Sequence, residues 1–216
     1  MKTPKNALLL IGSAKPAGES SSEALGAYVL ERLSAQGITT EVHHVARSLR
    51  TEARFQEFLA ALDRTDLFIL AFPLYVDSLP YLVVDALERI AAHRRAQIAP
   101  AQTAFLAISN CGFPESQHNA TALAICEQFA LETGFAWAGG LAIGAGGAIG
   151  GRPLTAAGAC YGKRSRRSTK WLRHLRKATQ PRPQRWPNWD DASFPLWPMS
   201  CWEILDGWQM HAGVTP

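Results

Sequence analysis

The sequence predicts an α/β fold built on a doubly wound, five-stranded parallel sheet, and two observations indicate it. The first two-thirds of the 216 residues alternate short apolar runs with longer segments of helical periodicity. Several of the apolar runs are continuous, which is typical of strands that helices bury on both faces. Because crossovers between parallel strands are right-handed, only a few doubly wound strand orders are left.

The first elements alternate as strand, helix and strand. The continuous apolar run at 7–11 is expected to be the first strand. The helix at 20–36 is expected to begin at Ser20, which has the spacing of a capping box with Glu23. The strand at 39–45 alternates polar and apolar residues, so we expect it near an edge of the sheet. Its two histidines are interpreted as a polar edge, not as a metal pair.

The remaining elements rest on the same two patterns. Apolar runs predict three more strands, at 67–72, 103–109 and 135–143. Periodic segments predict three more helices, at 54–62, 81–93 and 119–133. Gly134 follows the last of these helices, in the position that glycine favours after a helix end. Five strands separated by helices complete the predicted sheet.

The composition changes towards the C-terminus. We expect residues 1–160 to form one ligand-binding domain and 161–216 to be a basic, Pro- and Trp-rich extension that is not an independent domain. The segment 163–185 contains ten Lys and Arg and no acidic residue, whereas the rest of the chain has 12 basic and 18 acidic residues. A helix at 164–177 is expected to pack its apolar side on the sheet or on a partner subunit. Contact with a membrane surface, a polyanion or the extra phosphate of NADPH is the alternative.

Missing features exclude several classes of protein. No apolar run approaches the ~20 residues of a membrane span, and no signal-peptide core is present, so a cytoplasmic protein is expected. Outside the basic segment 163–185 the chain is mildly acidic, which gives no indication of nucleic-acid binding. The four cysteines are Cys111, Cys126, Cys160 and Cys201. Their spacing matches neither a zinc site nor an iron–sulfur site, so no metal is expected.

The loop after the first strand is rich in small and hydroxyl residues and leads into a helix. Exposed N–H groups at a helix N-terminus carry about half a positive charge and bind phosphate. The loop is neither a P-loop nor a GxGxxG motif, which favours a terminal monophosphate over a nucleoside triphosphate or a dinucleotide. The alternative is an ordinary capped helix start. The candidate phosphate ligands are Ser13, Lys15, Ser20, Ser21 and Ser22.

Two further loops follow the third and fourth strands, and the carboxyl ends of parallel strands meet at one edge of the sheet. Prolines make the segment 73–80 rigid and extended, and Tyr75 in it can offer an aromatic face to a flat ring. In the next loop Gly112 permits close approach, and Asn110 carries both a donor and an acceptor for a heterocycle. Each loop alone is compatible with a purely structural role. The candidate ring contacts are Pro73, Leu74, Tyr75, Val76, Asp77, Ser78, Asn110, Cys111, Gly112 and Phe113.

Taken in order, the three loops resemble a known family. Over roughly residues 5–155 they are similar to the NAD(P)H-dependent FMN reductase and iron–sulfur-flavoprotein-like branch of the flavodoxin-like superfamily. This resemblance implies the strand order 2-1-3-4-5, an FMN phosphate on the 13–22 loop, and an isoalloxazine ring between the other two loops. The motifs that carry it are Gly12-Ser13-x-Lys15 with Ser20-x-Ser22, then Pro73-Leu74-Tyr75-Val76-Asp77-Ser78-Leu79-Pro80, then Ser109-Asn110-Cys111-Gly112-Phe113-Pro114-Glu115.

The resemblance also implies an activity. FMN would be the cofactor of the 1–160 domain and NAD(P)H the co-substrate, and a hydride would pass through the flavin to a quinone, a flavin or a similar small acceptor. Members of this branch commonly form homodimers or tetramers with the flavin near a subunit interface. The cysteine cluster of the iron–sulfur members is absent, so a flavoprotein without a metal is expected. No catalytic side chain is named, because the cofactor carries the chemistry.

Other functions stay open at this point. A flavodoxin-type electron carrier would bind FMN without turning over NAD(P)H, but such carriers are usually strongly acidic and this chain carries a net charge of +4. A non-enzymatic protein of the same fold would use the basic extension as an interaction surface. The glycine-rich segment 144–151 misses the GxGxxG spacing and is interpreted as a flexible loop near the flavin, with a nicotinamide contact as the alternative.

Overall fold

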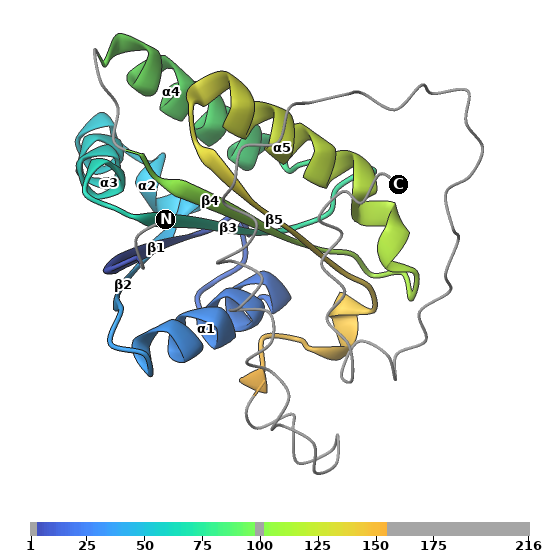
Figure 1. Cartoon of the computed structure of the whole chain (residues 1–216). Coiled ribbons are helices and arrows are strands. Elements are labelled where there is room, and N and C mark those ends of the chain that lie inside the picture. The colour runs from blue at the N-terminus through green and yellow to red at the C-terminus, as the bar shows by residue number, and fades with distance from the viewer. Residues whose placement is uncertain (1–3, 98–101, 155–216) are drawn as a thin grey trace, which may run out of the picture.

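The computed structural model describes residues 4–97 and 102–154, and these form a five-stranded parallel sheet with helices on both faces (Figure 1). The strand order is β2-β1-β3-β4-β5, and every neighbouring pair is parallel. Both the predicted fold class and the predicted order are therefore confirmed. The expected basic extension and its helix lie outside the described residues. The strands are β1 (Asn6–Ile11), β2 (Thr39–His44), β3 (Leu67–Pro73), β4 (Ala104–Asn110) and β5 (Ala136–Ile143).

Helices connect the strands and divide into two layers. In Figure 1, α1 lies on one side of the sheet, and α3, α4 and α5 lie on the other. The four-residue α2 was not predicted, because one helical turn is too short to show a period in the sequence. The helices are α1 (Ser21–Ser34), α2 (Val45–Ser48), α3 (Glu52–Asp63), α4 (Tyr81–Ala96) and α5 (Ala120–Thr133), with 3-10 turns η1 (Ser116–Asn119) and η2 (Gly146–Ala148). None of the helices in the described part of the chain combines the length and the apolarity that crossing a membrane requires.

Local sequence signals set the ends of these helices. The side chain of Ser20 accepts a hydrogen bond from the N–H of Glu23 at 3.0 Å, as the capping-box spacing predicted. The carboxylate of Glu23 accepts from the N–H of Gly18 at 2.7 Å, two residues before the position that the standard box uses. At the end of α5, Gly134 has a φ of 72°, which confirms its predicted role after the helix.

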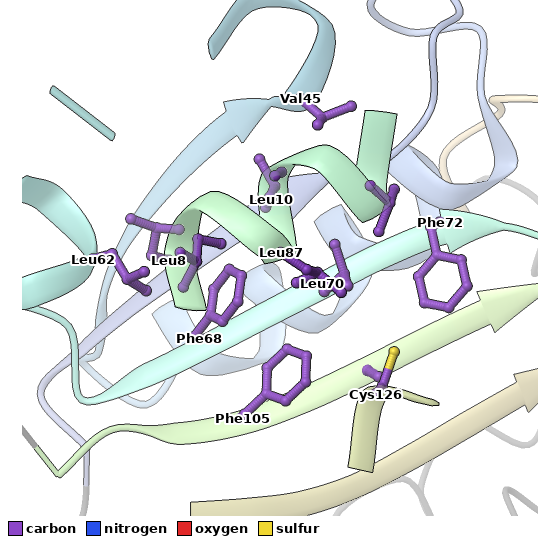
Figure 2. Packing of buried hydrophobic residues seen from close by; sticks show 14 of the residues in the cluster. Leu8, Leu10, Val45, Leu62, Phe68, Leu70, Phe72, Leu87, Phe105 and Cys126 are labelled. Atoms are coloured by element: carbon purple, nitrogen blue, oxygen red, sulfur yellow. The ribbon is translucent and has the colours of Figure 1, made fainter. Parts of the chain in front are cut away.

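A separate apolar core fills each side of the sheet. The side facing α3, α4 and α5 is rich in phenylalanine, and Phe68 and Phe105 stack there with ring centroids 5.1 Å apart (Figure 2). On the other side α1 packs closely on β1, since a Cβ at Gly26 would lie 2.6 Å from a methyl group of Leu9. This close packing fixes the position of α1 against β1.

The strand order determines where a ligand site can lie. From β1 the chain moves to β2 on one side and then to β3, β4 and β5 on the other. The loops that follow β1 and β3 therefore flank the point where the direction of winding reverses. In open α/β sheets ligands bind at this switch point, beyond the carboxyl ends of the strands.

Candidate functional site

Four loops leave the carboxyl edge of the sheet, and hydrogen bonds tie them together. The N–H of Leu74, after β3, donates to the carbonyl of Asn110, at the end of β4, at 2.8 Å. The N–H of Cys111 donates to the carbonyl of Ile143, at the end of β5, at 2.9 Å. The carbonyl of Cys111 accepts from the N–H of Gly146 at 2.7 Å. The loops after β3, β4 and β5 are thus connected, and the hydroxyl of Ser21, at the end of the first loop, joins them by donating to the carbonyl of Gly146.

The loop after β1 starts with a glycine that lies tightly against β3 and α4. The N–H of Gly12 donates to the carbonyl of Ala71 at 2.8 Å. An added Cβ at Gly12 would come within 2.5 Å of the Val83 side chain and 2.8 Å of Cβ of Phe72. Only glycine lets the loop pass this point. The next residue, Ser13, is buried and accepts a hydrogen bond from the N–H of Lys15 at 3.3 Å.

The N-terminus of α1 retains two free backbone donors. Ser20 caps the N–H of Glu23 through its side chain, and its carbonyl accepts from Ala24. The N–H groups of Ser21 and Ser22 form no hydrogen bond with any residue in the described ranges. Such a pair at the positive end of a helix dipole is suited to an anion.

The charged residues of this loop face solvent. The side chains of Lys15 and Glu19 are both exposed. An exposed carboxylate is well screened by water, and two unit charges 4 Å apart there interact by only ~1 kcal/mol. Glu19 therefore does not prevent an anion from binding at the helix end.

Two of the predicted phosphate ligands use their hydroxyl groups inside the protein. The hydroxyl of Ser21 donates to the carbonyl of Gly146 at 2.6 Å. The hydroxyl of Ser22 donates to Oδ1 of Asn110 at 2.7 Å, and both side chains are buried. Anion binding by this loop would therefore rest on backbone N–H groups and on Lys15. The predicted cofactor contacts of these serines stay predictions.

The loop after β3 forms a tight turn with an unusual backbone. Tyr75 and Ser78 exchange two backbone hydrogen bonds of 2.9 Å. Between them Val76 and Asp77 have φ angles of 47° and 56°, the left-handed conformation of a type I′ turn. A β-branched residue is strained there, and strain of this kind concentrates at binding sites. The turn presents Tyr75, which is 60% exposed, and Val76, which is 98% exposed.

We expect that replacing Val76 by Asn raises the free energy of unfolding of the flavin-free protein by about 1 kcal/mol. Asparagine tolerates the left-handed conformation, which costs most other L-residues roughly 1–2 kcal/mol. Urea denaturation of the variant and the wild type measures the difference. Val42→Asn, an exposed valine on β2 outside the left-handed region, serves as control and should not stabilise. A destabilised Val76→Asn variant would show that the turn is not strained.

The loop after β4 is supported from below by a buried asparagine. Asn119 is fully buried, and its Oδ1 accepts from the hydroxyl of Ser109 at 2.7 Å. Its amide group donates to the carbonyls of Ser116 at 2.9 Å and Ile143 at 3.3 Å, and to the sulfur of Cys111 at 3.4 Å. One satisfied polar side chain thus connects β4, η1 and β5.

The thiol in this loop is turned into the protein. The sulfur of Cys111 lies 3.5 Å from the carbonyls of Phe113 and Glu115, and the residue is 4% exposed. Burial raises the pKa of the Cys111 thiol, so it stays protonated at neutral pH and is a poor nucleophile. Its backbone groups are also engaged, so its predicted contact with a cofactor stays a prediction. Gly112 and Phe113 next to it are exposed, and the ring of Phe113 contacts His118.

The glycine-rich segment after β5 packs against the other loops. An added Cβ at Gly144 would collide with the backbone carbonyl of Pro114, and one at Gly151 with that of Gly18. The segment therefore packs against the first and third loops, and the flexibility expected from the sequence stays a prediction. The glycines themselves were the signal, because they permit backbones to approach closely. A pocket of about 200 Å³ lies between α1 and Leu154, and Gly18 of the first loop and Gly151 of the glycine-rich segment contribute to its lining.

The sequence matches no family model and no curated protein. The structure is similar to that of an NADH:FMN oxidoreductase in its apo form, with a TM-score of 0.58 and 18% identity over 81% of this chain and 88% of that one. A similar structure is that of an NAD(P)H:quinone oxidoreductase from Methanothermobacter marburgensis, with a TM-score of 0.48 and 16% identity over 82% of this chain and 98% of that one. Another is a Streptococcus pneumonia TIGR4 flavodoxin, with a TM-score of 0.47 and 15% identity over 64% of this chain and 84% of that one.

At these identities the likeness concerns the fold, and the activity must be argued from the residues of this chain. The strand order, the parallel pairing and the likeness to the NADH:FMN oxidoreductase structure agree. The chain has the flavodoxin-like fold.

Proposed function

We propose that this protein is an FMN-dependent oxidoreductase that passes a hydride from NAD(P)H through bound FMN to a quinone, a flavin or a similar small acceptor. The observation that carries the proposal is the group of loops at the switch point of the sheet. It combines free N–H donors at a helix N-terminus, an exposed aromatic turn and a polar carboxamide. A phosphorylated, flat heterocycle with polar edges matches these three features.

The residues of this chain fit such a cofactor at both ends. The N–H groups of Ser21 and Ser22, with Lys15 nearby in sequence, would hold the phosphate. Tyr75 and Phe113 are both exposed. Their loops are neighbours, because Pro73 at the end of β3 pairs with Asn110 at the end of β4. The two side chains would lie along the flat ring, and Asn110 would bind its polar edge. When bound, FMN supplies the hydride chemistry, and the protein positions it and excludes competing reactions.

The visible absorbance spectrum of the purified protein tests the proposal. We expect a yellow protein, or one that becomes yellow when FMN is added, and we expect anaerobic NADPH to bleach it. NADPH oxidation in the steady state with a quinone would separate an enzyme from an electron carrier. A protein that stays colourless and has no affinity for FMN would refute the proposal.

We further propose that the protein forms a homodimer or tetramer through this edge of the sheet. Large apolar side chains are exposed on its loops and at the start of α4, namely Tyr75, Val76, Tyr81 and Phe113. Exposed apolar groups of this size favour a protein interface. We expect light scattering to give an oligomeric mass for the wild type and a smaller mass for Val76→Asp, which places a charge at the most exposed position. A monomeric wild type would contradict this proposal.

A further inference from the structure

The side chain of Asn110 is held between two loops and keeps one donor unused. Its Oδ1 accepts from the hydroxyl of Ser22 at 2.7 Å. Its Nδ2 lies over Gly146, where an added Cβ would approach to 2.8 Å. Nδ2 forms no hydrogen bond with the residues that the structure describes, although Asn110 is only 7% exposed. Nδ2 is not among the buried unpaired atoms of the described residues, so it reaches the surface, where water or a ligand can accept its hydrogen bond.

Ser22 holds one end of this carboxamide. The terminal torsion of an asparagine is broad and nearly two-fold, so its donor and acceptor ends exchange easily in an unconstrained site. In the structure the hydroxyl of Ser22 donates to Oδ1, and this pairing leaves the Nδ2 end of the carboxamide available. Ser22 is itself 1% exposed and sits in the first turn of α1, so its hydroxyl has little freedom to leave.

We propose that Ser22 is a positioning residue for the flavin ring and that its hydroxyl is not a phosphate ligand. It orients Asn110 so that the N–H2 group faces the ring, and the ring atom that this group recognises is therefore a hydrogen-bond acceptor. This inference rests on the proposed function. It gives α1 two tasks, because the backbone N–H of Ser22 serves the phosphate and its hydroxyl serves the ring contact.

Flavins with and without a phosphate separate the two roles. We expect Ser22→Ala to lower the affinity for FMN and for riboflavin by the same factor, about tenfold for one lost hydrogen bond, as measured by flavin fluorescence quenching. We also expect Asn110→Ala to cost less affinity in the Ser22→Ala background than in the wild type, because both changes remove the same contact. A merely structural role would not produce this coupling.

A matched variant controls for lost stability. Thr103 is fully buried at the opposite end of the sheet, and its hydroxyl donates to the carbonyl of Thr65 at 2.8 Å. We expect Thr103→Val to lower the Tm as Ser22→Ala does, but to leave both flavin affinities unchanged. If Thr103→Val lowers the affinities equally, the effect of Ser22→Ala reflects stability alone and the assignment is wrong.

The remaining outcomes are distinct. If Ser22→Ala weakens FMN and leaves riboflavin unchanged, Ser22 is a phosphate ligand and the inference is overturned. If neither affinity changes, the hydroxyl has no part in binding and the inference is again overturned. A wild-type protein that binds neither flavin would remove the proposed function, and this inference with it.

Discussion

Replacing Ser21 by proline is expected to weaken the binding of FMN by about ten- to hundredfold while α1 stays folded. Ser21 is the first residue of α1, a position that tolerates proline because its N–H has no partner within the helix. Proline removes this N–H, which the proposal assigns to the phosphate. A hydrogen bond to a charged group contributes about 1.5–3 kcal/mol, which corresponds to the stated loss.

The backbone conformation around Ser21 accommodates proline without a change in the fold of α1. Ser20 has φ and ψ angles of −107° and 140°, the extended conformation that the residue before a proline prefers. Ser21→Ala is the control, because it also removes the hydroxyl that bonds to Gly146 but keeps the N–H. Calorimetric titration should show the Pro and Ala variants differing in affinity for FMN and agreeing in affinity for riboflavin. Equal affinities of the two variants for FMN would refute the phosphate site at this helix end.

Replacing Phe68 by alanine is expected to lower the free energy of unfolding by about 3–5 kcal/mol. Phe68 is fully buried at the centre of the core between the sheet and α3, α4 and α5 (Figure 2). Its ring stacks on Phe105 at 5.1 Å and lies 5.8 Å from Phe135 and 6.4 Å from Phe58. The surrounding rings cannot all move inward to fill the cavity, so both transfer and cavity costs apply.

Chemical denaturation of the flavin-free protein measures this loss. Phe113→Ala is the matched control, because the same side chain is removed from a position that is 57% exposed. We expect the control to change the free energy of unfolding by less than about 1 kcal/mol. A loss below that value for Phe68→Ala would mean that this core is loosely packed.

The sheet was predictable from the sequence because its interior strands lie under helices on both sides. β1, β3 and β4 are buried along almost their whole length, so their residues form continuous apolar runs. β2 is an edge strand, and its alternating pattern predicted that position. One irregularity was not predicted. The pairing of β4 with β5 shifts its register between Phe105 and Leu106, and no residue pattern in the sequence indicates this shift.

The candidate site was predictable as a set of loops but not as a set of contacts. Strand ends located the three loops, and the capping box located the start of α1. The turn at Val76 and Asp77 lacks the Asn-Gly sequence that marks type I′ turns, so its conformation gave no local signal. Ser22 and Asn110 are 88 residues apart, and only the folded sheet brings them together. Residue types indicated phosphate chemistry at Ser22, which stays a prediction, and they gave no sign that its hydroxyl bonds to Asn110.

The affinities of the wild-type protein for FMN and for riboflavin, measured side by side, test the central claim most directly. The two ligands share the ring and differ in the phosphate. If the N-terminus of α1 holds a phosphate through the N–H groups of Ser21 and Ser22, FMN binds at least about tenfold more tightly than riboflavin. Equal affinities, or no binding of either flavin, would contradict the account.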